Sequence, residues 1–347
     1  MKMTKKNIII SVVVVGLIIL SYLNVLPNST PVQMVFNIAL TVAGFVLLIK
    51  GADVFVEGAS KIATKFNIPQ MVIGLTIVAF GTSLPEAAVS ISGALSGNAG
   101  ITVGNVVGSN IMNILLILGV SATIAALPIK KNTFRIEIPF VIVITIIMLL
   151  LGMAGDELSR LDGVIFLGLM AAFMVYLVYS AKNGEADDET TVLTEKDTMP
   201  ILLLFVVIGA VCIVIGSNVT VDAVSYIAEK CGMTPRLIGL TIVAFGTSLP
   251  ELVTSATAAK RGKVDIAIGN IVGSNIFNVL FVVGLSAVIT DITFEAAFIK
   301  DTIVAIAAAV ILFLAVIKDK KLKKPASIFM LVCYAAYFAY ILAMNYA

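Results

Sequence analysis

The sequence predicts an all-α integral membrane protein made of two related halves with opposite orientations in the membrane. Of the 347 residues, 60% are hydrophobic and 13% are charged, which is more apolar side chain than a soluble domain of this size buries. The apolar residues form runs long enough to cross a bilayer, which takes about 20 helical residues. One long segment also occurs twice, about five spans apart.

The apolar runs define eleven candidate spans. A transmembrane β-barrel would instead show short alternating segments. The first run follows Lys2, Lys5 and Lys6 and resembles a signal peptide. It lacks an A-x-A-like cleavage site and is rather long, so we expect a retained helix. The predicted spans are about 7–26, 32–60, 70–95, 100–126, 134–153, 162–182, 199–229, 235–259, 264–290, 297–317 and 326–345.

The basic residues predict the orientation of a multi-pass protein in the cell membrane. If the spans alternate from a cytoplasmic N-terminus, 18 Lys and Arg residues fall inside, and only Arg160, Lys230 and Arg236 fall outside. The C-terminus then lies outside. The net charge of +2 indicates no particular partner, because the charges are segregated by topology, and we expect a lipid environment and no nucleic acid.

Between the halves lies the only long polar stretch, "NGEADDETTVLTEKDT" at 183–198. Its acids could bind regulatory calcium, but they lack the D-x-D-x-D-G spacing, so we interpret it as a solvated cytoplasmic linker. The absence of histidine excludes His-based relays and His-ligated zinc. The three cysteines form no CxxC and are interpreted as ordinary apolar residues. We expect an extra helix at 1–30, a first half at 31–182 and a second half at 199–347.

The internal repeat aligns residues 73–115 with 238–280 without a gap, at an offset of 165, and about 27 of the 43 pairs are identical. Each unit holds about five spans. Since five is odd, the second copy enters the membrane from the opposite face. Such inverted repeats are typical of secondary transporters, whose sites lie near the midplane at the repeat interface.

The repeated motif "GTSLPE" carries oxygen donors. The ring of Pro85 clashes with the carbonyl of Gly81, so the helix must kink or break and free carbonyl oxygens around Ala79 to Thr82. Thr82 and Glu86 are four residues apart and share a helix face, and Ser83 lies close by. Carboxylate, hydroxyl and carbonyl oxygens suit sodium or calcium and not soft metals. The second copy offers Ala244, Thr247, Ser248, Pro250 and Glu251.

The span after each motif contains "GN", "GSN" and a further asparagine. Ser109 and Asn113 are again four residues apart, as are Ser274 and Asn278. The glycines of the small-xxx-small pairs favour close helix packing over ion binding, and they are Gly104, Gly108, Gly269 and Gly273.

The pseudo-two-fold axis would bring Glu86 and Glu251 together in the middle of the membrane. Each carboxylate costs a few kcal/mol or more there, and two that face each other repel. A calcium ion, or several sodium ions, would relieve both costs, so occupancy would be mutually exclusive. A simple helix kink with hydroxyls bonded to carbonyls explains one such motif, but explains two symmetric copies poorly. For Asp53, Glu57 and Asp222, near span ends, we favour interfacial or packing roles over ion binding.

At these residues the sequence resembles the sodium/calcium exchangers of the cation/calcium antiporter superfamily, of the prokaryotic type. The "GTSLPE" and "GN(V/I)VGSN" segments are similar to the signatures of that family's two alpha repeats. The resemblance implies a ten-helix core of two inverted five-helix repeats, here preceded by one extra helix. It also implies that helices 32–60 and 199–229 slide as a gate over a fixed core.

The resemblance also implies a ligand set, with a central calcium site made by the two glutamates and flanking sodium sites. Amides at both Asn113 and Asn278 favour potassium independence, because some relatives carry a potassium-linked aspartate at the second position. Two carboxylates neutralise one calcium, so exchange for three or more sodium ions would move charge. The implied ligands are Ala79, Thr82, Ser83, Glu86, Ser109, Asn113, Ala244, Thr247, Ser248, Glu251, Ser274 and Asn278.

The sequence leaves other functions open. A proton/calcium antiporter is the main alternative because glutamates carry protons, although the hydroxyls fit sodium better. A calcium channel is less favoured, since it gains nothing from inverted repeats. An enzyme is disfavoured by the absence of histidine, of a metal motif and of a nucleophile paired with a base. No cofactor other than the transported ions is expected.

Overall fold

The computed structural model describes residues 16–17, 30–95, 100–183, 193–233, 242 and 244–346. Within these residues, eight helices are long and apolar enough to cross a membrane. A ninth span is added if the helices Gln70–Thr82 and Leu84–Leu95, bent by 50° at Ser83, count as one. The predicted span 7–26 and the first part of 235–259 lie largely outside the described residues.

Helices make up nearly all of the structure, and several contain π-helical turns (η). The first half contains α2 (Thr30–Phe66), α3 (Gln70–Ile73), η1 (Gly74–Val78), α4 (Ala79–Thr82), α5 (Leu84–Leu95), α6 (Gly100–Met112), η2 (Asn113–Leu118), α7 (Gly119–Ile124), η3 (Thr133–Glu137), α8 (Ile138–Gly155) and α9 (Arg160–Asn183). The second half contains α10 (Met199–Lys230), α12 (Ala244–Thr247), α13 (Leu249–Lys260), α14 (Val264–Phe277), η5 (Asn278–Val283), α15 (Gly284–Ile289), α16 (Ala296–Val316) and α17 (Lys324–Tyr346).

The elements of the two halves recur at nearly the offset of the sequence repeat. The π-turns η2 and η5 begin 165 residues apart, at Asn113 and Asn278. Two short antiparallel pairings, β1 with β4 and β2 with β3, each join one half to the other. These strands are β1 (Leu127–Pro128), β2 (Glu157–Leu158), β3 (Ile292–Thr293) and β4 (Lys321–Leu322).

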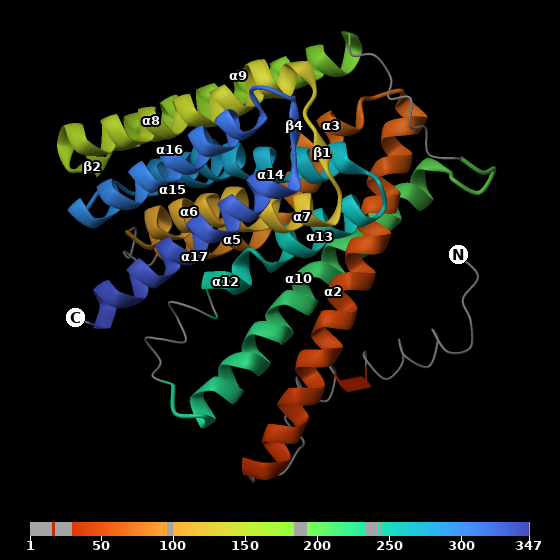
Figure 1. Cartoon of the computed structure of the whole chain (residues 1–347), viewed down its shortest axis with the longest axis horizontal. Helices are drawn as coiled ribbons and strands as arrows, with labels where there is room; N and C mark the ends of the chain where they lie inside the picture. Colours follow the sequence, from red (N-terminus) through yellow and green to blue (C-terminus); the bar gives the residue numbers. More distant parts are fainter. Residues whose placement is uncertain are drawn as a thin grey trace.

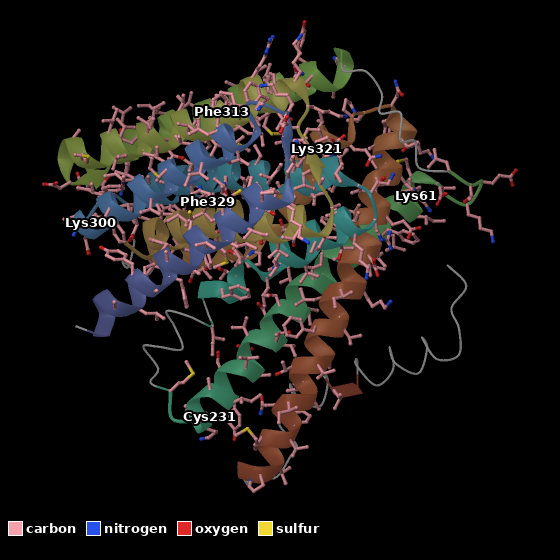
Figure 2. The ribbon with its side chains drawn as sticks, viewed as in Figure 1. Lys61, Cys231, Lys300, Phe313, Lys321 and Phe329 are labelled. Atoms are coloured by element: carbon pink, nitrogen blue, oxygen red, sulfur yellow. The ribbon has the colours of Figure 1, made fainter. Side chains whose placement is uncertain are left out.

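Contacts between the loops show which of them share an end of the bundle. At one end, β1 pairs with β4, Lys61 forms an ion pair with Asp197 at 2.9 Å, and Lys130 pairs with Asp265 at 2.8 Å. At the other end, β2 pairs with β3. Figure 2 shows Lys61 and Lys321 toward one side of the molecule and Lys300 toward the other. We call the first end the lysine end.

The long helices α2 and α10 form an antiparallel pair set at an angle to the remaining bundle (Figure 1). Glycines let their backbones approach closely. A Cβ added at Gly51 would lie 3.0 Å from the carbonyl oxygen of Gly209. One added at Gly216 would lie 2.9 Å from that of Gly44. Any larger residue at these positions would therefore force the two helices apart.

The other helices enclose a core that is buried on all sides. Every residue of α14 from Ile266 to Phe277 is buried, so this helix and its continuation η5 run through the centre of the bundle. A span surrounded by protein has no lipid-facing side, and it can carry polar side chains provided that they find partners. The polar residues of the repeated motifs lie at this centre.

Candidate ion-binding site

Two interrupted helices position the motif residues. In the first half α4 ends at Thr82, and α5 begins at Leu84. In the second half α12 ends at Thr247, and α13 begins at Leu249. Each proline occupies the second position of the helix that follows the break, where its missing N–H costs nothing. The structure therefore places each glutamate in the first turn of a 12-residue helix.

The two glutamates are fully buried and bonded across the halves. Ser248, of the second motif, donates to Glu86 Oε1 at 3.2 Å, and Ser109 donates to the same oxygen at 3.3 Å. Ser83, of the first motif, donates to Glu251 Oε1 at 2.9 Å. The serine of each motif thus contacts the glutamate of the other motif, so the two copies form one site.

Five buried oxygens of this cluster have no hydrogen-bond partner within the part of the chain that the structure describes. They are one carboxylate oxygen each of Glu86 and Glu251, the amide oxygens of Asn113 and Asn278, and the Ser274 hydroxyl. A buried polar atom without a partner costs about 1–3 kcal/mol, and more if charged. Such atoms are rare in folded proteins. Their number here, with acceptor oxygens predominating, indicates a place built for cations.

The helix ends add favourable electrostatics. Glu86 and Glu251 lie at the N-termini of α5 and α13, where the helix dipole carries about half a positive charge. This dipole stabilises a carboxylate but does not neutralise two of them in a dry core. Within the part of the chain that the structure describes, no three Asp, Glu or Cys residues converge on one point. Any bound cation therefore depends on hydroxyl and amide oxygens as well as on the two carboxylates.

A layer of four asparagines surrounds this cluster, and two of them, Asn110 and Asn275, were not part of the predicted ligand set. Asn113 donates to Asn275 Oδ1 at 3.1 Å, and Asn278 donates to Asn110 Oδ1 at 3.1 Å. These reciprocal bonds aim the free amide oxygens of Asn113 and Asn278. The sequence held a signal for this layer, because Asn110 and Asn275 are themselves related by the offset of 165.

The motif residues farther out form a similar reciprocal pattern. Thr82 donates to Asn270 Oδ1 at 3.0 Å, and Asn270 donates to Ser255 Oγ at 2.8 Å. In the first half, Asn105 donates to Ser90 Oγ at 3.0 Å. These bonds fix the helices α6 and α14 against α5 and α13, and thereby fix the rotamers of the central side chains.

The remaining predicted ligands differ in their surroundings. The carbonyl of Ala79 is not free, since it accepts the Ser83 N–H at 3.0 Å and the Thr82 hydroxyl at 3.4 Å. Thr247 is half-buried and lines a cavity beside the cluster. The Ala244 side chain lies outside the described part.

The motif glycines also differ from one another. A Cβ at Gly269 would meet the Met71 carbonyl oxygen at 2.7 Å, and one at Gly273 would meet Ala79 Cβ at 2.8 Å. At Gly104 the nearest described atom is 3.6 Å away, and at Gly108 no described atom lies within 4 Å. Tight helix contact is therefore seen at the two glycines of the second half.

Taken together, the helical bundle and its centre define a class. The protein is a multi-pass membrane protein with an enclosed, oxygen-lined site at the junction of two related halves, the arrangement that secondary transporters use. Residues 36–179 and 201–343 match the family described as "Sodium/calcium exchanger protein". The chain belongs to this family of transporters.

Similar proteins cover most of the chain. It is 40% identical to a protein of Alkalimonas amylolytica named putative antiporter CaxA, over 81% of this chain and 90% of the relative. It is 30% identical to the sodium/calcium exchanger MaX1 of Methanosarcina acetivorans, over 87% and 97%. Among solved structures, it is similar to the sodium-calcium exchanger NCX_Mj soaked with 2.5 mM Na⁺ and 0.1 mM Ca²⁺. That match has a TM-score of 0.76 and 33% identity, and covers 87% of this chain and 97% of the other.

Proposed function

We propose that the chain exchanges sodium for calcium across the cell membrane by alternating access, without potassium and with net movement of charge. The observation that carries this proposal is the set of five unpartnered buried oxygens, contributed by both halves. Membership of the exchanger family supports it. The cations are the substrates of the protein and not resident cofactors.

The chemistry assigns Glu86 and Glu251 to calcium. Calcium prefers six to eight hard oxygen ligands and tolerates irregular geometry, and its charge balances the two carboxylates. Sodium ions would share the same carboxylates together with the nearby hydroxyl and amide oxygens. The two kinds of occupancy exclude each other, and exclusive occupancy is what an antiporter requires. Further ligands are proposed at Thr82, Ser83, Ser109, Asn113, Thr247, Ser248, Ser274 and Asn278 and at the carbonyls of Ala79 and Ala244. To bind an ion, the Ala79 carbonyl would have to give up the hydrogen bond from the Thr82 hydroxyl.

The proposed transport cycle uses the α2 and α10 pair as the gate. The core is the inverted arrangement of two five-helix halves, with one further helix at the N-terminus. The matching element offsets and the two reciprocal strand pairings support this arrangement. The close glycine contacts between α2 and α10 support movement of that pair as one unit, because separation would open their packed backbones.

The function is tested by calcium uptake into sodium-loaded proteoliposomes. We expect uptake to require an outward sodium gradient and to be unaffected when potassium is replaced by choline. Uptake should increase when the interior is made positive and decrease when it is made negative, because net positive charge leaves with three or more sodium ions per calcium. Uptake that ignores sodium but follows a pH gradient would instead establish a proton/calcium antiporter. Flux that ignores both gradients would indicate a channel.

A further inference from the structure

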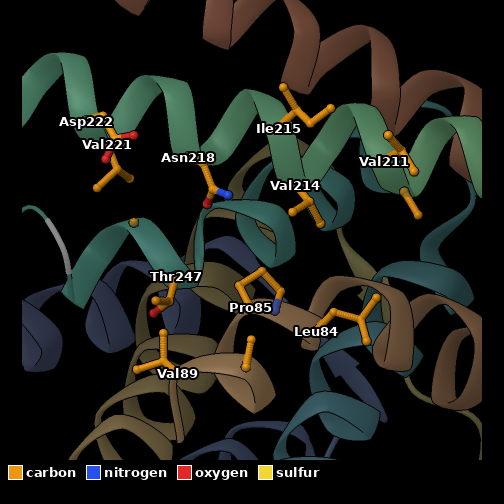
Figure 3. A pocket seen from close by; sticks show the side chains of 13 residues that line it. Leu84, Pro85, Val89, Val211, Val214, Ile215, Asn218, Val221, Asp222 and Thr247 are labelled. Atoms are coloured by element: carbon orange, nitrogen blue, oxygen red, sulfur yellow. The ribbon is translucent and has the colours of Figure 1, made fainter. Parts of the chain in front are cut away.

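Beside the cluster lies a cavity of about 710 Å³ between α10 and the two interrupted helices. Pro85 and Thr247 form part of its wall, and each is the residue immediately before a side chain of the cluster, Glu86 or Ser248. Figure 3 shows that the polar lining of the cavity is uneven. Asn218 and Asp222, one turn apart on α10, lie on the same side as Thr247, whereas the rest of the lining is mainly aliphatic.

The internal repeat provides a direct comparison for these two residues. At the offset of 165, Asp222 corresponds to Glu57 on α2, and Asn218 corresponds to Asp53. Both acids on α2 are half-buried and paired with cations at the lysine end. Arg261 lies 3.0 Å from Asp53 and 3.7 Å from Glu57, and Lys61 lies 3.0 Å from Glu57.

We call α2 and α10 the gate pair. At the end of this pair opposite the lysine end, the carboxylate of Asp222 is not neutralised by described ion pairs as that of Glu57 is. Asp222 is exposed in the cavity, and no described basic side chain forms an ion pair with it. The nearest cation along α10 is Lys230, about 12 Å farther on by the helix rise, and its ammonium group lies over the Tyr226 ring at 5.3 Å. The repeat also explains the difference, because a serine at position 96 stands where the second half has Arg261.

We propose that Asp222, with Asn218 beside it, draws the cation into this cavity and so controls its arrival at the central site from the end opposite the lysine end. A single negative charge in a cleft with low-dielectric walls raises the local concentration of cations and their rate of arrival. The Asn218 amide offers a further oxygen one turn closer to the cluster. The proposal rests on the proposed function only in that the cation drawn in is the transported one.

The first experiment measures the charge of the cavity without any transport. In a background with Cys212, Cys231 and Cys333 changed to serine, Asn218→Cys is reacted with a positively and a negatively charged methanethiosulfonate. We expect the positive reagent to react faster, and Asp222→Asn to lower the ratio of the two rates by about fivefold or more at low salt. Asp222→Glu should keep the ratio. Glu157→Gln, which removes a carboxylate at the same end but outside the cavity, should leave it unchanged.

The second experiment measures transport separately from each side, in right-side-out and inside-out vesicles. Asp222→Asn should raise the calcium concentration for half-maximal uptake about threefold or more from the cavity side only. The effect should shrink at high ionic strength, because salt screens an exposed charge. An unchanged reagent ratio, or an equal change from both sides, would refute the assignment. If wild-type protein shows no sodium-driven calcium transport, the proposed function fails, and the reagent ratio still decides the role of Asp222.

Discussion

At the scale of single residues, the central question is how two carboxylates remain buried together. Serine hydroxyls donate to one oxygen of Glu86 and to one oxygen of Glu251, and the other oxygen of each carboxylate has no hydrogen-bond partner among the described residues. Hydroxyl donors reduce the cost of burying a charge but do not neutralise it. If a cation binds there as proposed, it would supply the missing partner for these oxygens, and the stability of the site would then depend on its occupancy.

This dependence predicts the effect of neutralising either carboxylate. Glu86→Gln or Glu251→Gln should lower exchange by at least about 100-fold, since breaking a buried charge pair costs about 3–5 kcal/mol. The amide keeps the shape and removes the charge, so the ion-free protein should melt at the same temperature or higher. In these variants, the increase in melting temperature that calcium causes should be lost together with transport. Glu157→Gln is the matched control, and wild-type exchange by either site variant would remove these glutamates from the mechanism.

At the scale of elements, the end of α2 is tied to two other segments by charge. Arg261, after α13, binds Asp53 through its Nε and Nη2 atoms, both at 3.0 Å. Asp197, before α10, binds Lys61 at 2.9 Å, and Lys65 donates to the Asp197 carbonyl at 2.7 Å. Together these contacts hold the lysine end of the gate pair against the core.

The contact of Arg261 with Asp53 and Glu57 predicts what happens to the end of α2 when this contact is removed. Arg261→Gln should increase hydrogen exchange in the last third of α2, residues 53–66, because both acids there lose a partner. Ion pairs this exposed contribute about 1 kcal/mol or less, so the increase should be about fivefold at most. Arg160→Gln, at the other end of the bundle, is the control. Hydrogen exchange that is unchanged in α2 of Arg261→Gln would show that the contact with Arg261 does not hold the helix.

The Asp197 contact predicts a pH range. The Lys61 ammonium, with the backbone and side chain of Thr194, lowers the pKa of Asp197 to about 2. A carboxyl group with a depressed pKa stabilises the fold above its unfolded pKa of about 3.9, and this stabilisation is lost as the pH falls toward 2. In the wild type, the rate of protease cleavage near residue 197 should therefore be constant from pH 8 to 5. In Asp197→Asn the rate should be higher than in the wild type throughout that range. Cleavage that rises between pH 8 and 5 in the wild type would contradict this.

The same elements show how far the sequence could predict the structure. The apolar runs predicted the long helices, and the repeated proline predicted where regular helix becomes unfavourable, because both signals are local. The Arg261 contact with Asp53 joins residues 208 positions apart, and no local pattern reports such a pair. The linker was interpreted as solvated, yet Asp197 is buried and bonded. Asn110 and Asn275 were missed because an amide in a span serves equally as ligand or as support.

At the scale of the whole molecule, the open question is which end faces the cytoplasm. The structure assigns loops to two ends through their contacts, and the lysine-end loops carry most of the basic residues. The charge bias of membrane proteins predicts that this end is cytoplasmic. Cys231 follows the last residue of α10, is exposed, and lies at the far end of the gate pair from Lys61 (Figure 2). It is therefore a natural reporter of orientation.

A membrane-impermeant maleimide applied to intact cells should label Cys231. Cys212 and Cys333 are half-buried, so Cys231→Ser should abolish most of the labelling and serves as the control. In inside-out vesicles the same reagent should label the wild type weakly, and a cysteine introduced at Lys321 should react instead, because β4 lies at the lysine end. The reverse pattern would invert the predicted topology. The Asp222 cavity would then open to the cytoplasm, although the central site and the comparison of Asp222 with Glu57 would be unaffected.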